Sequence, residues 1–219
     1  MLKNKANPDI IGGKPKKGKV REYLEAFVIA LVIALVVRSL FFQAFKIPSG
    51  SMENTLLVGD HIFVNKFAYG YKVPFIEGRI LDFGKPKHGD IIVFVFPEDN
   101  SKDFIKRVIG APGDVIEIKR DGVIRNGETL KEGYAQYMDG TEYDMLGQVW
   151  EELPPITVPS GKYFVLGDNR DRSYDSRFWG FVDSEALIGK ATFIYFSIDW
   201  SRDIGRGLIR WNRIGNLLK

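Results

Sequence analysis

The apolar residues divide the chain into one long run near the N-terminus and a series of shorter runs after it. Residues from Ala26 to Val37 carry no polar side chain, and after a short polar break the apolar character continues to Phe45. At 1.5 Å per residue, a helix from Ala26 to Phe45 would be about 30 Å long, roughly the thickness of a bilayer's hydrocarbon core. The pattern predicts a single transmembrane anchor over residues 24–45.

Two other structures are compatible with this run, a cleaved signal peptide and a buried core helix. A cleavable signal peptide needs small residues after its apolar core, whereas residues 38–45 are mostly bulky. A buried helix fits the short, strictly apolar core. The flank before Tyr23, however, carries seven Lys and Arg residues against two acidic ones. This flank favours an uncleaved anchor, with residues 1–23 as a basic cytoplasmic tail and Lys46 onward outside the cytoplasm.

Short runs rich in β-branched and aromatic residues follow the anchor and predict strands. They cover residues 61–65, 90–96, 114–119, 162–166 and 190–196. Asp121-Gly122 predicts a hairpin, and Pro and Gly clusters separate the other runs. We expect a mainly β fold of coiled, partly closed antiparallel sheets that form one extracytoplasmic catalytic domain over residues 46–203. Residues 128–157 lack clear periodicity and predict a less regular excursion on the surface.

The last residues, 204–219, alternate apolar and basic side chains and contain Trp211. This composition predicts a basic amphipathic segment that rests on the membrane. A terminal helix that packs on the β domain fits the same pattern equally well.

Composition narrows the chemistry that the chain can perform. The chain has 219 residues, 45% hydrophobic and 27% charged, which excludes a disordered or polytopic protein. Its net charge of +3 is too small to indicate nucleic acid as a partner. Because there is no cysteine, disulfides, thiol nucleophiles and thiolate metal sites are excluded. The two histidines, His61 and His88, occur at a strand start and in a turn, and we interpret both as exposed structural residues.

A candidate nucleophile follows the apolar run in Pro48-Ser49-Gly50-Ser51-Met52. Pro48 stiffens the chain, and Gly50 lets the backbone form a tight turn. Ser51 is then placed to attack a carbonyl, while its own N–H and the Ser49 hydroxyl point at a developing oxyanion. Taken alone, Ser-Gly-Ser is also an ordinary turn.

The serine needs a base, and Lys106 is the best candidate, although a Ser-His-Asp arrangement stays open. Lys106 lies among apolar neighbours such as Phe104 and Val108, and burial lowers the pKa of a lysine by disfavouring its charge. In a strand, Lys106 and Arg107 point to opposite faces, so we expect one to be buried while the other meets water. A solvated lysine on an edge strand is the alternative for this segment alone.

A third polar segment runs from Gly167 to Arg177 between two apolar strands. One interpretation is a solvated loop. The other is that Asp175 and Arg177 form an ion pair that braces a site, while Ser173 accepts a hydrogen bond that orients the lysine.

Together the three segments resemble the type I signal peptidases, the bacterial leader peptidases. The family's nucleophile box is similar to residues 48–52, and its lysine box to residues 106–110 and 112–114. Its third box is similar to residues 167–169 with Ser173, Asp175, Ser176 and Arg177. The order of the three boxes behind an N-terminal anchor makes the resemblance specific. The chain differs from many relatives in having one expected spanning helix rather than two.

The resemblance implies a membrane-anchored serine endopeptidase that removes signal peptides from exported preproteins after small-x-small sequences. It implies a location in the inner (plasma) membrane with a periplasmic catalytic domain, membrane lipid as a partner, and no metal or other cofactor. Ser51 would be the nucleophile, neutral Lys106 the general base, Ser49 an oxyanion donor and Ser173 the residue that orients Lys106. The substrate cleft would use Ile47, Met52 and Phe104, and the supporting residues would be Gly167, Asp168, Asn169, Asp175 and Arg177.

Two other functions remain compatible with the sequence. The first is another Ser-Lys maturation protease with one dedicated substrate. The second is a membrane-anchored β module that binds partners and has lost activity, although Ser51, Lys106 and Ser173 are all present, which counts against it.

Overall fold

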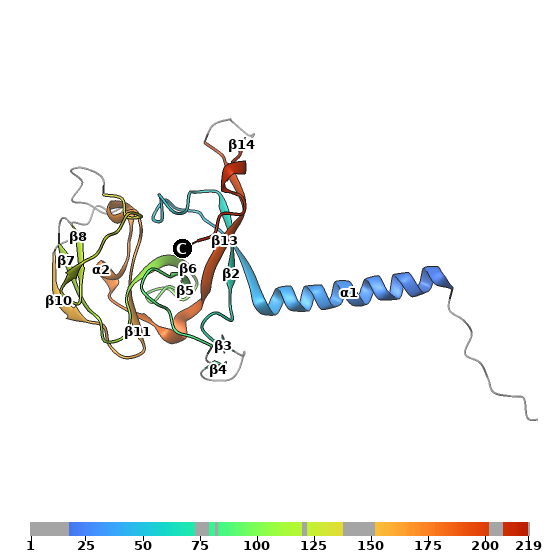
Figure 1. Ribbon diagram of the computed structural model, residues 1–219, viewed down its shortest axis with the longest axis horizontal. Coiled ribbons are helices and arrows are strands. Elements are labelled where there is room, and N and C mark those ends of the chain that lie inside the picture. Colours follow the sequence, from blue (N-terminus) through green and yellow to red (C-terminus); the bar gives the residue numbers. More distant parts are fainter. Residues whose placement is uncertain are drawn as a thin grey trace, which may run out of the picture. The chain divides into compact units, whose positions relative to one another are not determined.

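The computed structural model describes residues 18–72, 79–81, 83–119, 122–137, 152–201 and 208–218 (Figure 1). The chain divides into two compact units, Met1–Ser39 and Leu40–Lys219. The first unit contains most of one helix, and the second contains the β-sheets.

Helix α1 spans Lys19–Phe41 and covers the strictly apolar part of the predicted anchor. Its first turn carries Glu22, which suits the positive end of the helix dipole, and Arg21 pairs with Glu25 at 3.0 Å. Its large apolar side chains that the structure describes are mostly exposed. Among the residues that the structure describes, no helix combines the length and the hydropathy needed to cross a membrane. The anchor stays a prediction.

The helix was expected to continue to Phe45, and this part of the prediction is wrong. Strand β1 occupies Phe42–Lys46 and pairs antiparallel with β2, Asp60–Asn65, with Phe42 opposite Asn65 and Lys46 opposite His61. The side chains of β1 alternate between exposed and half-buried, as a period of two requires. Apolar content alone could not separate this short strand from the end of the helix.

The large sheet holds the residues of interest. Its strand order is β1-β2-β13-β5-β6-β11-β12, with β14 paired to β13, and neighbouring strands are antiparallel. The bounds of the remaining strands are Leu187–Asp199 for β13, Ile91–Val95 for β5, Asp103–Gly110 for β6, Lys162–Leu166 for β11, Val182–Asp183 for β12 and Leu208–Ile209 for β14. Strand β6 therefore lies inside the sheet, between β5 and β11, and is not an edge strand.

A smaller sheet has the order β10-β7-β8-β9, and β3 pairs with β4. In the β domain of Figure 1, β7, β8 and β10 lie on the side away from β2 and β13. The bounds are Leu153–Thr157 for β10, Val115–Lys119 for β7, Gly122–Arg125 for β8, Glu128–Thr129 for β9, Tyr71–Lys72 for β3 and Arg79–Leu81 for β4. The predicted mainly β, antiparallel fold is thus confirmed, and β7 and β8 form the expected hairpin.

Strands β9 and β10 lie inside the region where no strand was expected, residues 128–157. Strand β10 contains Pro154 and Pro155, which lack N–H donors and lower the strand signal in the sequence. Both prolines are exposed, and β10 is an edge of its sheet, which is where proline is tolerated. Residues 138–151 of the expected excursion lie outside the described residues.

The described residues of the second unit also contain four short helical segments. They are the single-turn helices η1, Arg170–Arg172, α2, Ser176–Trp179, η2, Ser184–Ala186, and η3, Trp211–Arg213. The described part of the C-terminal segment consists of β14, η3 and the chain up to Leu218, so neither a long amphipathic helix nor a packed terminal helix is present among residues 208–218. Leu218 is buried in the core beside Met52 and Leu56.

Candidate active site

Ser51 lies in a turn that follows β1 and is held by backbone hydrogen bonds. Glu53 N donates to Gly50 O at 3.0 Å, and Leu56 N donates to Met52 O at 2.7 Å. The side chains of Met52 and Leu56 are fully buried, which ties the turn to the hydrophobic core beneath it. Ser51 itself is 5% exposed, so its hydroxyl has a fixed environment.

Lys106 lies on β6, opposite Ile92 of β5, and reaches the serine from the sheet. Its Nζ donates a hydrogen bond of 2.8 Å to Ser51 Oγ, across 55 positions of sequence. Lys106 is 4% exposed, and its Nζ lies 5.3 Å from the centre of the Phe104 ring. The structure thus brings the candidate nucleophile and the candidate base into direct contact.

Burial lowers the pKa of Lys106 to about 8, because an apolar setting penalises the ammonium form. Among the nearby charges, Asp175 raises this pKa, Arg177 lowers it and Asp168 raises it, each less than burial does. Asp175 and Arg177 form a buried ion pair of 2.9 Å and therefore act on the lysine in opposite directions. A substantial neutral fraction of Lys106 is present near pH 8, as a general base requires.

Arg107 does not meet water, contrary to our expectation from the alternation of β6. It does point away from Lys106, but it is 2% exposed, because its guanidinium forms a bidentate pair with buried Asp168 at 2.8 and 2.7 Å. The guanidinium also donates to Gly89 O and lies 3.9 Å from the centre of the Tyr134 ring. Both faces of β6 are therefore covered at this point. The burial of Arg107 depends on Asp168, which lies 61 residues away in the chain.

The third polar segment is folded against the serine turn rather than solvated. Asn169 N donates to Ser51 O at 3.1 Å, and Asn169 Nδ2 donates to Glu53 Oε2 at 3.2 Å. Gly167 has no room for a side chain, because a Cβ there would collide with Ser173 Oγ and with the Ser51 carbonyl oxygen. The backbone from 167 to 169 thus forms one wall of the site.

The expected ion pair between Asp175 and Arg177 holds this wall in place. Asp175 caps α2 by accepting from Arg177 N, and it also accepts from Gly167 N at 3.1 Å. Arg177 Nη2 donates to the carbonyl oxygens of Arg170 and Ser173. Burial raises the pKa of Asp175, but the Arg177 guanidinium, the Ser173 hydroxyl and the hydrogen bond from the Gly167 N–H together lower it by more. The net pKa shift is therefore downward, and the carboxylate stays ionised.

The position of Ser173 fits its predicted role only in part. Its side chain is completely buried, packs against Gly167 and helps to lower the pKa of Asp175. Among the contacts of the described residues, none is a hydrogen bond between Ser173 Oγ and Lys106 Nζ. The expectation that Ser173 accepts a hydrogen bond from the lysine is not met in this structure.

The remaining predicted residues surround the serine. Ser49 is half-buried, two residues before Ser51. Ile47 and Met52, expected in the substrate cleft, are buried in the core cluster beneath the turn, whereas Phe104 is partly buried and stacks on Phe96 at 4.2 Å. Of the three, Phe104 alone keeps part of its surface free beside Lys106.

Several residues of the site were not apparent from sequence. Thr55 Oγ1 donates to Asp168 at 2.5 Å, and buried Arg170 forms a bidentate pair with Glu132 at 2.6 and 2.8 Å. Tyr137 also contacts Arg170 at 2.8 Å, so the segment before residue 138 is packed on the third polar segment. No motif or periodicity marks these partners, because each pair joins segments that are far apart in the chain.

No cluster of three or more His, Cys, Asp or Glu side chains able to hold a metal ion occurs in the described part of the chain. The side chains at the site offer a buried hydroxyl and an amine with a lowered pKa, together with the backbone and hydroxyl donors around them.

Comparison with known proteins points to one family. The family model described as "Signal peptidase, peptidase S26" matches residues 20–196. The chain is 36% identical to a signal peptidase I of Pseudomonas fluorescens, covering 89% of this chain and 78% of the relative. It is 38% identical to a signal peptidase I of Rickettsia typhi, covering 85% of each chain. A crystal structure of a signal peptidase I from Enterococcus faecalis is 34% identical, with a TM-score of 0.40 over 49% of this chain and 97% of that one.

Proposed function

The chain belongs to the signal peptidase family, peptidase S26, and from this premise we propose that Ser51 and Lys106 cleave signal peptides from exported preproteins. It is a serine endopeptidase. The observation that supports these residue roles most strongly is the 2.8 Å contact between Lys106 Nζ and Ser51 Oγ in a buried setting.

The first half of the reaction needs a neutral lysine. Deprotonated Lys106 takes the proton of the Ser51 hydroxyl as Oγ attacks the scissile carbonyl, and the hydrogen bond between them reverses its direction. The Ser51 N–H and the Ser49 hydroxyl stabilise the oxyanion that forms. The Lys106 ammonium then gives its proton to the leaving amine, which departs as the new N-terminus of the mature protein.

The second half uses the same groups on water. Lys106, neutral again, removes a proton from a water molecule that attacks the Ser51 ester. The Lys106 ammonium then gives this proton to Ser51 Oγ as the ester bond breaks, so the serine hydroxyl is restored and the carboxyl end of the signal peptide is released. Asp175 with Arg177, and Asp168 with Arg107, keep the wall at Gly167 in register with the serine turn. Ser173 fills the space beside Gly167, Ile47 and Met52 support the serine turn from the core, and Phe104 is the residue that can contact small substrate side chains.

The test is cleavage of a preprotein by purified variants. Ser51→Ala and Lys106→Ala should each lose cleavage almost completely, because one removes the nucleophile and the other the base. Ser101→Ala and Lys102→Ala are matched controls, since both residues are exposed and lie at the start of the same strand region. Cleavage at near-normal rates by either site variant would refute the assignment. Mass spectrometry of the cut preprotein should place the cut after a small-x-small sequence in more than one preprotein, which separates this function from a dedicated maturation protease.

We also propose that the helical part of the apolar run, residues 24–41, anchors the protein once in the inner membrane. Large apolar side chains of α1, Phe27, Ile29, Leu31, Val32 and Leu35 among them, lie exposed, which is unfavourable in water and favourable in lipid. The basic tail places the N-terminus in the cytoplasm and the β domain on the periplasmic side.

The absence of cysteine makes this topology simple to test. A single cysteine at Lys14 should be protected from a membrane-impermeant maleimide in intact spheroplasts, and one at Lys102 should be labelled. Labelling of both cysteine variants, or release of the protein from the membrane by alkaline carbonate, would contradict the proposed topology.

A further inference from the structure

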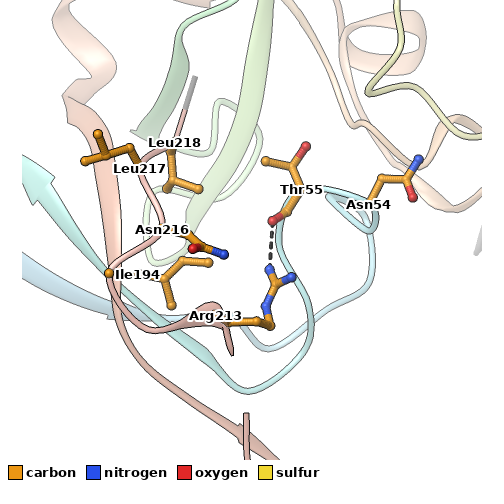
Figure 2. A pocket seen from close by; sticks show the side chains of 8 residues that line it. Asn54, Thr55, Ile194, Arg213, Asn216, Leu217 and Leu218 are labelled. Carbon is orange, nitrogen blue, oxygen red and sulfur yellow. Dashed lines mark hydrogen bonds between the residues drawn. The ribbon is translucent and has the colours of Figure 1, made fainter. Parts of the chain in front are cut away.

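Thr55 connects the serine turn to two distant parts of the β domain. Its side chain donates to Asp168, whose carboxylate pairs with Arg107 next to the candidate base. Its carbonyl oxygen accepts a hydrogen bond of 2.8 Å from Arg213 Nη2 (Figure 2). Four residues earlier, the Ser51 carbonyl oxygen accepts from Asn169 N. The turn is thus fixed at its start by the third polar segment and at its end by η3.

Arg213 is itself held firmly. Its guanidinium pairs with Asp60 through Nε at 3.1 Å and Nη2 at 2.6 Å, and the Asp60 side chain is completely buried. Asp60 also accepts from Leu57 N at 2.8 Å and from Ser197 Oγ at 2.6 Å. A planar guanidinium that binds a carboxylate and a carbonyl at once leaves little freedom to the segment it contacts.

Arg210 repeats the arrangement one turn earlier. Its Nη2 donates to Val58 O at 2.6 Å, and its Nε donates to Ser197 Oγ at 2.7 Å. Two arginines of one short segment therefore hold carbonyl oxygens of the loop that joins the serine turn to β2. Leu218 is buried in the same hydrophobic cluster as Met52 and Leu56, so both segments contribute to one part of the core.

The geometry points to Arg213 as a positioning residue for Ser51, with the C-terminal segment 208–218 acting as a clamp on the serine turn. This inference rests on the proposed function. The Ser51–Lys106 contact joins a turn to a rigid interior strand, so its length depends on where the turn is held. At the far end of the turn, Asp168 and Arg107 hold the Thr55 side chain, and Arg213 holds the Thr55 carbonyl oxygen, so Arg213 supplies the restraint on the backbone there.

A cavity of about 550 Å³ beside this contact supplies an independent test. It is lined by Arg213, Thr55, Asn54, Ile194, Gly215, Asn216, Leu217 and Leu218 (Figure 2). Because the Thr55–Arg213 contact lies on the wall of this cavity, a small soluble guanidinium ion has a path to the position that a truncated Arg213 side chain would vacate.

The experiment compares full-length variants in detergent on one preprotein. Arg213→Ala should lower kcat by about 10- to 100-fold with KM within twofold, because misplacing a nucleophile by about 1 Å has effects of this size. Millimolar guanidinium should raise the kcat of Arg213→Ala at least threefold and leave the kcat of the wild type unchanged. Asn212→Ala, an exposed neighbour in η3, is the control and should keep the wild-type kcat.

Arg213→Ala removes an ion-pair partner of the buried Asp60 carboxylate and can therefore destabilise the fold. A second variant distinguishes a loss of positioning from a loss of folding. Asp60→Asn with Arg213→Met removes the buried charges and the donor to Thr55 together. It should unfold within a few degrees of the wild type and still show the lowered kcat. The inference would be overturned by a folded double variant with wild-type kcat. It would also be overturned if Arg213→Ala raised KM instead of lowering kcat, or if guanidinium did not raise the kcat of folded Arg213→Ala. If the wild type cleaves and Ser51→Ala does not, such a result leaves the proposed function intact.

Discussion

Replacing Lys106 with methionine should make the folded chain more stable at neutral pH even though it removes the proposed base. Burial lowers the pKa of Lys106 from its ordinary value of 10.5 to about 8. Each pKa unit corresponds to about 1.4 kcal/mol, so the charged lysine costs the folded state about 3 kcal/mol. Methionine fills a similar volume without a charge and avoids this cost.

The sign and the pH window follow from proton binding. Between about pH 8 and 10.5 the unfolded chain keeps a proton on Lys106 that the folded chain has released, so the wild type gains about 1.4 kcal/mol of stability per pH unit. Below pH 8 both states carry the proton, and above 10.5 neither does, so the contribution is constant in both regions. Relative to Lys106→Met, the wild type should therefore gain about 3 kcal/mol between pH 7.5 and 10.5.

The assay is equilibrium unfolding of both full-length proteins in the same detergent at a series of pH values. Taking the difference between the two proteins cancels the titration of all other groups. Lys102→Met is the control, because its side chain is 63% exposed and its removal relieves no buried charge. A difference between wild type and Lys106→Met that stays constant across this range would refute the claim that Lys106 is a buried amine with a lowered pKa.

Two further predictions concern the wall of the site. Arg177→Met removes the positive charge that lowers the pKa of Lys106 and leaves Asp175 without its ion-pair partner, so the pKa of Lys106 should rise. The increase of kcat/KM with pH, measured on a preprotein, should then occur at higher pH. An unchanged pH profile in a folded variant would contradict this. Gly167→Ala should lower kcat at least about 100-fold, because its methyl group displaces the serine turn. Gly133→Ala, where a Cβ meets nothing within 4 Å, is the control, and equal cleavage by the two alanine variants would show that the wall does not position the turn.

The parts of the fold with clear local patterns were predictable from sequence. Short runs rich in β-branched and aromatic residues located β2, β5, β7, β11 and β13, and Asp121-Gly122 located the hairpin between β7 and β8. Strand β1 was not separable from the apolar helix before it, because both are apolar and only pairing with β2 distinguishes them. Strand β10 was hidden by two prolines that only an edge position tolerates.

The site was predictable to the extent that short motifs carry it. The segments of Ser51, Lys106 and Asp175 were recognisable because each combines unusual residues within a few positions. The burial of Arg107 and the clamp by Arg213 were not, because their partners, Asp168 and Asp60, lie 61 and 153 residues away in the chain. Such contacts are products of tertiary packing, and no local pattern encodes them.

The measurement that tests the central claim most directly is the pH dependence of kcat/KM for preprotein cleavage. If neutral Lys106 is the base for Ser51, kcat/KM should rise tenfold per pH unit below an inflection near pH 8 and level off above it. The stability of the folded chain should be checked at each pH, so that a loss of rate through protonation of Lys106 is distinguished from a loss through unfolding. A rate that stays flat from pH 6 to 9, or an inflection that persists at the same pH in residual activity of Lys106→Met, would contradict the account.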